Sequence, residues 1–139
     1  MIFINLPVRD LPRSIAFYEA TGARVNPDFT DETAACMVIS DTIFVMLLTH
    51  EKFASFTSRR IIGRDSVEAL LCLSCPSKQA VLDQLEAAVA AGGRPDPIAE
   101  QDYGFMYGRS YEDPDGHIWE VMWMDPAAAA EGPQAMAEA

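Results

Sequence analysis

The sequence predicts an α+β fold in which two βαβββ modules form a curved mixed sheet around a cleft. Short apolar segments of strand character alternate with only two amphipathic helical segments. The helices begin at the capping residues Asp10 and Ser77, 67 positions apart, and three strand-like segments follow each helix. We expect one domain at residues 1–125, with a linker between the modules at 50–66 and a flexible tail at 126–139.

The first module is expected at residues 1–49. Residues 2–8 have strand character, and Asp10 then caps a helix that Gly22 ends. The strands expected after this helix lie at about 23–29, 34–39 and 42–48. A Ser-Asp pair separates the last two strands, and both residue types favour turns. This order of elements makes the first βαβββ unit.

The second module is expected at residues 67–125 and repeats that order. A strand at 67–75 precedes Ser77, which caps a helix that ends at Gly92. The helix is expected to turn four side chains inward: Val81, Leu85, Ala88 and Val89. The strands expected after it lie at about 94–100, 105–112 and 117–124. An Asp-Pro-Asp-Gly sequence before the last strand is typical of a tight turn.

The expected last strand, residues 117–124, is apolar on both faces except for one carboxylate. Because strand side chains alternate, Glu120 shares a face with Ile118 and Met122, whereas Trp119 takes the other face. We therefore expect Glu120 to be largely buried. A buried ionised carboxylate is costly unless a cation, a metal or several hydrogen-bond donors meet it. Glu120 is thus expected to have a partner in the protein or in a ligand.

Composition excludes several classes of protein. With 21 acidic and 10 basic residues the net charge is -11, which disfavours nucleic acid and anionic lipid as partners. We find no apolar run long enough to span a membrane and no signal-peptide pattern, so we expect a cytoplasmic protein. Three cysteines in such a chain indicate reduced thiols. Cys72 and Cys75 form a C-x-x-C, but on one strand they point to opposite faces, which disfavours a redox or zinc site.

Two motifs resemble a known family. The first is L-P-V-R-D-L-x-x-S-x-x-F-Y-x-x-x-G at Leu6 to Gly22, and the second is D-P-D-G-x-x-x-E at Asp113 to Glu120. Together with the internal repeat, they resemble the vicinal oxygen chelate superfamily, which includes glyoxalase I, bleomycin-resistance proteins and extradiol dioxygenases. The resemblance implies the fold of residues 1–125 more strongly than it implies any one reaction.

The resemblance also implies four positions for metal ligands. They fall on Phe3, Leu70, about Leu47 and Glu120. Phe and Leu side chains offer a divalent ion no lone pairs, so only Glu120 matches the family pattern. We therefore expect no metal and no other cofactor, and a divalent metal bound by displaced ligands stays open as an alternative.

Other polar and soft side chains are candidates for a binding pocket. Those with an expected place in or near the cleft are Asn5, His50, Tyr107, Arg109 and Met122, together with Phe3, Leu47 and Leu70 from the family positions. Arg109 could neutralise Glu120 or bind an anionic substrate, or it could lie on the outer face above tyrosines. Asn5 could donate to a ligand or bond only to backbone, and His50 could instead end a solvated loop. His117 is expected to be a polar hairpin residue rather than a ligand.

The sequence leaves three functional hypotheses. The first is a small-molecule-binding protein related to glyoxalase and bleomycin-resistance proteins, in which Glu120 contacts the ligand or acts as a base without a metal. The second is a metal-dependent lyase or dioxygenase in which His50 or an acidic loop residue joins Glu120. The third is a structural dimer without a ligand. A homodimer is expected in each case, because symmetric pairing is common among small soluble domains.

Overall fold

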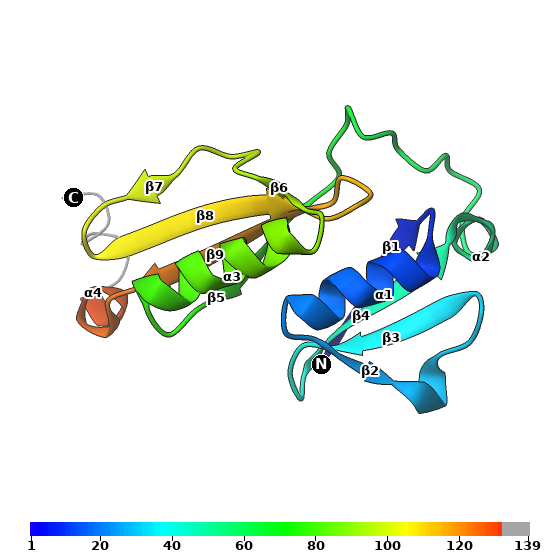
Figure 1. Ribbon diagram of the computed structural model, residues 1–139, viewed down its shortest axis with the longest axis horizontal. Helices are drawn as coiled ribbons and strands as arrows, with labels where there is room; N and C mark the ends of the chain where they lie inside the picture. Colours follow the sequence, from blue (N-terminus) through cyan, green and yellow to red (C-terminus); the bar gives the residue numbers. More distant parts are fainter. Residues whose placement is uncertain (132–139) are drawn as a thin grey trace.

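The computed structural model describes residues 1–131 of the chain. It contains two sheets with strand orders β1-β4-β3-β2 and β5-β9-β8-β6, and β7 pairs with the outer part of β8. The sheets lie side by side, and helices α1 and α3 cover the same side of the pair (Figure 1). This arrangement confirms the α+β fold of two βαβββ modules.

The first module contains six elements in chain order. They are β1 (Ile2–Val8), α1 (Leu11–Ala20), β2 (Arg24–Asn26), the 3-10 helix η1 (Pro27–Phe29), β3 (Ala34–Val38) and β4 (Ile43–Thr49). Strand β1 pairs in parallel with β4, which is antiparallel to β3. Strand β2 is shorter than the expected 23–29, because Pro27 begins η1 and has no N–H to continue the ladder.

The second module repeats the parallel pairing, here between β5 and β9. Its elements are β5 (Leu70–Ser74), α3 (Lys78–Ala90), β6 (Arg94–Pro95), β7 (Gln101–Asp102), β8 (Met106–Glu112) and β9 (Ile118–Met124). The expected strand at 94–100 is reduced to Arg94–Pro95, since Asp96 turns the chain with a φ of 54°. The chain then returns to the sheet at β7.

Two further helices lie outside the modules. The linker begins with α2 (His50–Ala54), and α4 (Pro126–Glu131) follows β9 where a flexible tail was expected. The rest of that tail, residues 132–139, lies outside the described part of the chain. None of the described helices is long and apolar enough to cross a membrane.

Both main helices begin and end as the sequence predicts. The Asp10 carboxylate accepts a hydrogen bond from the Arg13 N–H at 3.1 Å, and Ser77 Oγ accepts one from the Ala80 N–H at 3.0 Å. Beyond their last turns, Gly22 and Gly92 have φ values of 106° and 100°, a region that favours glycine. Local sequence therefore fixes where the two helices start and stop.

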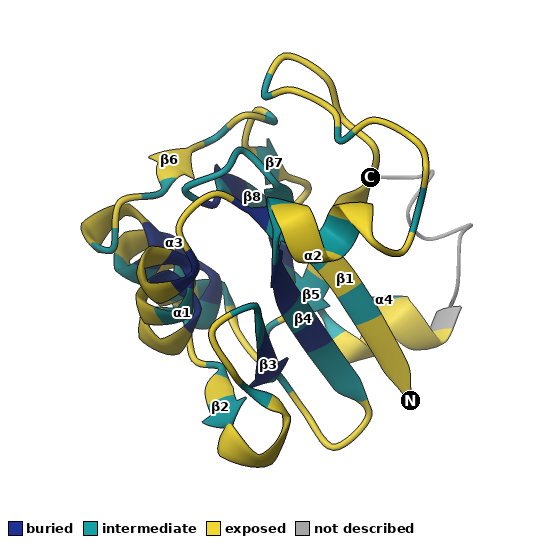
Figure 2. Cartoon of the chain, turned by 90° about the vertical axis from the view of Figure 1, so that its right-hand side faces the viewer, coloured by how far each residue is buried: buried dark blue, intermediate teal, exposed yellow. Residues whose placement is uncertain are grey.

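The core lies between the helices and one face of each sheet. Figure 2 shows the buried residues along the strands and on the inner sides of α1 and α3. Trp119 and Val121 of β9 are fully buried beneath α3, together with Val81 and Ala88 of the helix. Val89 was expected inward, but 42% of it is exposed, because it lies about 100° around the helix from Ala88.

A buried polar cluster joins the two modules. Tyr18 of α1 donates its hydroxyl to Asp113 Oδ2 at 2.6 Å, and Trp119 Nε1 donates to the Tyr18 oxygen at 3.0 Å. The other Asp113 oxygen accepts the N–H groups of Asp115 at 2.9 Å and of His117 at 2.8 Å. Burial raises the pKa of Asp113, while the charge of His117 and the hydrogen bonds from Tyr18 and the His117 N–H oppose that shift. The motif residues Tyr18 and Asp113 thus fasten the first module to the last turn of the second.

Candidate functional site

The candidate site lies on the sheet face that the helices leave open. Glu120 pairs across the ladder with Cys72 of β5 and Ser110 of β8, so all three side chains belong to this open face. Glu120 is only partly buried, and its carboxylate makes no hydrogen bond or ion pair with any residue in 1–131. Glu120 keeps some exposure because no helix covers this face, and the partner that its burial was expected to require is absent among the described residues.

A small hollow surrounds Glu120 in the second module. Its volume is about 120 Å³, and segment 98–101 forms one wall above β8 and β9. Ser110 Oγ holds that segment, since it accepts the Ile98 N–H at 3.0 Å and donates to the Ile98 carbonyl at 2.9 Å. The other walls come from Cys72, Met106 and Met122. One carboxylate thus lies among soft, polarisable side chains.

The first module has a matching open face without a carboxylate. Phe3 and Phe44 stack there with ring centroids 4.8 Å apart, and 51% of Phe3 is exposed. The pair Phe3–Phe44 in the first sheet corresponds to the pair Leu70–Ile118 in the second sheet. Met46 lies two residues after Phe44, and Glu120 lies two residues after Ile118. Met46 is therefore the counterpart of Glu120 in the first module. Leu47, the residue assigned to this position from the sequence, is fully buried in the helix-side core. A shift of one residue on a strand exchanges the faces, which explains the error.

The residues at the four equivalent positions do not fit a metal of the family type. Phe3 and Leu70 offer only carbon, Met46 offers a weak thioether sulfur, and Glu120 is the single carboxylate. Among residues 1–131, no three His, Cys, Asp or Glu side chains come together as a group that could hold an ion. The arrangement can instead hold an apolar body against Met side chains and a donor or cationic group against Glu120.

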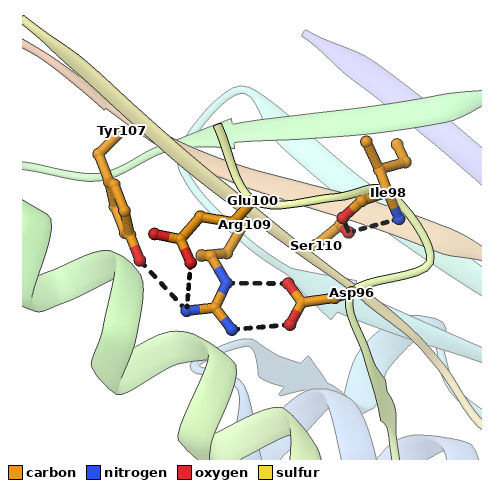
Figure 3. A network of polar contacts seen from close by, with 6 residues as sticks. All are labelled: Asp96, Ile98, Glu100, Tyr107, Arg109 and Ser110. Carbon is orange, nitrogen blue, oxygen red and sulfur yellow. Dashed lines mark hydrogen bonds and ion pairs between the residues drawn. The ribbon is translucent and has the colours of Figure 1, made fainter. Parts of the chain in front are cut away.

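Arg109 is not the partner of Glu120. It pairs with Val121 in the ladder and so belongs to the helix-covered face. Its Nε and Nη2 atoms donate to the two oxygens of Asp96 at 2.8 and 2.7 Å, and Nη1 donates to the Tyr107 hydroxyl at 3.1 Å (Figure 3). Hydrogen bonding from Arg109 is the main cause that lowers the pKa of Asp96.

Tyr107 is likewise part of the core rather than the open face. It is buried, and Lys78 Nζ lies 5.7 Å from its ring centroid on the helix side. The ladder from Met106 to Glu112 is continuous, so strict alternation assigns Tyr107 and Arg109 to the same face. Arg109 and Tyr107 therefore lie on the face opposite Glu120, which corresponds to the alternative that the sequence left open for Arg109.

Asn5, His50 and His117 line a different cavity between the modules, and none of them lines the hollow around Glu120. His117 Nε2 donates to the Pro7 carbonyl at 2.8 Å and so bridges the modules. His50 is the first residue of α2. Asn5 lies on the exposed side of β1, with no side-chain hydrogen bond among the described residues.

Sequence reasoning missed two residues beside Glu120. Cys72 and Ser110 face it across the ladder, although Cys72 could have been found because it lies two residues beyond Leu70 on the same strand. Burial, followed by the negative charge of Glu120, raises the pKa of Cys72. The thiol therefore stays protonated near neutral pH, which suits a ligand-contact residue better than a nucleophile.

Comparisons with known proteins agree with this architecture. The sequence matches the Glyoxalase/Bleomycin resistance protein/Dioxygenase superfamily over residues 2–121. A comparison with curated proteins finds no match. The fold resembles that of a hypothetical protein from S. aureus, with a TM-score of 0.75 and 23% identity over 88% of this chain and 92% of that one.

Two other solved structures share the fold at lower identity. A glyoxalase/bleomycin resistance protein/dioxygenase family enzyme from Burkholderia phytofirmans has a TM-score of 0.72 and 19% identity, covering 88% of this chain and 96% of that one. Fosfomycin resistance protein FosX from Mesorhizobium loti has a TM-score of 0.68 and 14% identity, covering 94% and 96%. Similarity at this level shows the fold alone. With the match over residues 2–121, the chain belongs to the glyoxalase/bleomycin resistance protein/dioxygenase superfamily.

Proposed function

We propose that this protein binds a small, largely apolar molecule on the open faces of its sheets, with Glu120 as the polar anchor. The observation that carries the proposal is a carboxylate without a protein partner among residues 1–131, set beside Cys72 and Met122. Apolar sites with few polar groups are typical of small-molecule pockets. The anchor selects a ligand that carries a cationic or hydrogen-bond-donating group on an aromatic or aliphatic body.

A second copy of the chain would complete this site. Half of each of Phe3 and Leu70 is exposed on the open faces, and Phe44, Met46 and Met122 are only partly buried there. Soluble monomers rarely leave large contiguous apolar patches uncovered. An isologous homodimer would bury both open faces and enclose a cup larger than the hollow of about 120 Å³ seen in one chain.

Binding can be tested with three ligands of similar shape: 4-phenylbutylamine, 4-phenylbutanol and 4-phenylbutyrate. We expect the amine to bind most tightly at this site, with perturbed NMR signals from the methyl groups of Met46 and Met122. Glu120→Gln should weaken the amine at least tenfold and leave the alcohol nearly unchanged. Glu86→Gln, at an exposed position on α3, removes the same charge as a control. Equal affinities for wild type and Glu120→Gln would refute the anchor.

The dimer has a separate test. Sedimentation at micromolar concentration should show twice the mass of the chain, and Leu70→Glu should shift the protein toward monomer because it buries a charge in the proposed interface. The control is Leu82→Glu, since Leu82 is also partly exposed (38%) but lies on α3. A monomeric wild type that still binds the amine would reject the dimer and keep the anchor.

A further inference from the structure

A second and larger cavity lies between the modules, away from the hollow around Glu120. Its volume is about 430 Å³, within the range of small-molecule sites. Strands β1 and β5 and the turn before β9 form its floor, and the linker forms its roof. Glu120 does not line it, so the two sites are distinct.

The charge of this cavity is opposite to that of the chain. Acidic residues outnumber basic ones 21 to 10 in the sequence. Around the cavity the ratio reverses, because the charged residues lining it are Arg9, Arg59, Arg60 and Arg64 against Glu68 and Asp115. Both histidines of the chain, His50 and His117, also line it. Solvated surface charge alone would follow the acidic composition of the whole molecule.

One of the two carboxylates is already engaged by the protein. Asp115 Oδ1 accepts the Arg9 backbone N–H at 2.9 Å, and Oδ2 accepts the Ser14 hydroxyl at 3.3 Å. The side chains of Arg9, Arg59 and Arg60 form no ion pair with any residue in 1–131. These three guanidinium groups are therefore not neutralised by a direct ion pair with any described residue.

Among the arginines that line this cavity, Arg64 is the one whose side chain is held by hydrogen bonds to the described residues. Its Nη1 donates to the Pro114 carbonyl at 3.0 Å, and its Nη2 pairs with Glu112 at 3.3 Å. It crosses the turn at Gly116, where an added Cβ would lie 2.7 Å from Arg64 Cγ. Arg64 Nε is buried without a hydrogen-bond partner among the described residues, and an unpaired buried donor is costly. Arg64 is thus a fixed part of the cavity wall.

The remaining walls are apolar. They come from β1, β5, α2 and the linker, and the larger side chains are Ile4, Leu6, Phe53, Ile61 and Leu71. We propose that this cavity is a binding site for a small organic anion, with an acidic head group against the arginines and an apolar body against these side chains. A carboxylate and a phosphonate share this chemistry.

The test is titration with 4-phenylbutyrate at low ionic strength, followed by calorimetry and by NMR of the Ile methyl groups. Arg59→Gln/Arg60→Gln should weaken the carboxylate at least tenfold, and added salt should weaken wild type in the same direction. Arg24→Gln/Arg94→Gln removes the same charge from two exposed arginines that do not line the cavity, and should change the affinity less than twofold. Equal loss in both double variants would overturn the site in favour of a general charge effect.

Three further measurements decide the ligand chemistry and the location. 4-Phenylbutanol should bind at least tenfold more weakly than the carboxylate, and inorganic phosphate should also bind more weakly because it lacks the apolar body. Phenylphosphonate binding more tightly than phenylbutyrate would identify a phosphonate as the favoured head group and support the anion site. Phosphate binding as tightly as phenylbutyrate would overturn an organic ligand. Glu120→Gln should leave phenylbutyrate binding unchanged, and a tenfold loss there would overturn a separate site.

Discussion

Asp113 and Glu120 are seven residues apart in one motif, yet their surroundings differ in every respect. Asp113 is fully buried, and both its oxygens accept hydrogen bonds from Tyr18, Asp115 and His117. Glu120 is partly exposed and has no partner among the described residues. The difference shows that two carboxylates of one sequence signature can lie in opposite environments, one inside the fold and one free to meet the proposed ligand.

Replacing Asp113 is the most direct test of the contrast between the two carboxylates. Asp113→Ala leaves the Tyr18 hydroxyl and two backbone N–H groups buried without an acceptor, so we expect unfolding free energy to fall by about 3 kcal/mol. Asp113→Asn keeps one acceptor oxygen and should lose about half as much. Urea denaturation measures both, and a loss below about 0.5 kcal/mol for the alanine variant would contradict the anchoring role.

The pH dependence of stability tests the buried environment of Asp113. Burial raises the pKa of Asp113 above its ordinary value of 3.8, so the folded protein holds this proton more tightly than the unfolded chain. The contribution of this proton binding to the free energy of unfolding is therefore complete below pH 3.8. It declines as pH rises through the raised pKa of Asp113 in the folded protein. The stability difference between wild type and Asp113→Asn should shrink across that interval. A difference that grows with pH would mean that the carboxylate is better stabilised than its burial implies.

A double-mutant cycle tests whether Arg109 interacts with Asp96 or with Glu120. We expect a coupling of about 1 kcal/mol between Arg109→Gln and Asp96→Asn, because their two hydrogen bonds are short but partly exposed. Coupling between Arg109→Gln and Glu120→Gln should be near zero, since the side chains lie on opposite faces. Thermal unfolding of the single and double variants supplies the values, and the reverse order of couplings would place Arg109 at the open face.

The smallest expected effect belongs to Glu120. Glu120→Gln should change unfolding free energy by no more than about 0.5 kcal/mol, because no buried partner among residues 1–131 loses a bond. Chemical denaturation of the ligand-free protein measures it. A loss of several kcal/mol would mean that Glu120 supports the fold as Asp113 does.

Local signals in the sequence predict much of the fold. The caps Asp10 and Ser77, the glycines after both helices and the alternation in β9 each depend on a few neighbouring residues. Two predictions were wrong for local reasons. Val89 is exposed because of its angle around the helix, and the strand expected at 94–100 is cut short by the turn at Asp96. These errors moved the boundary or the face of an element without changing the order of elements.

The site was harder to predict because it depends on register and on what lies outside the strand. Leu47 was one residue away from Met46, and only the pairing of β1 with β4 shows the correct face. The sequence left open whether Arg109 neutralises Glu120, binds an anionic substrate or lies on the outer face. Its pairing with Asp96 requires the sharp turn that brings segment 96–100 back to β8, which the sequence did not predict. The apolar neighbours of Glu120 indicate that it is mostly buried, but they do not show that the helices leave its face of the sheet open.

The open face of β9 has a consequence for how such a protein can diverge. Trp119 and Val121 hold the core from one side of the strand, whereas Glu120 and Met122 on the other side contribute little to it. Substitutions on the open face of β9 therefore leave the fold nearly as stable as before. Selection can act on these residues independently of the residues that form the core. Under the proposed function, a lineage could exchange one ligand preference for another by replacing alternate residues of this strand, while the intervening residues keep the inherited architecture.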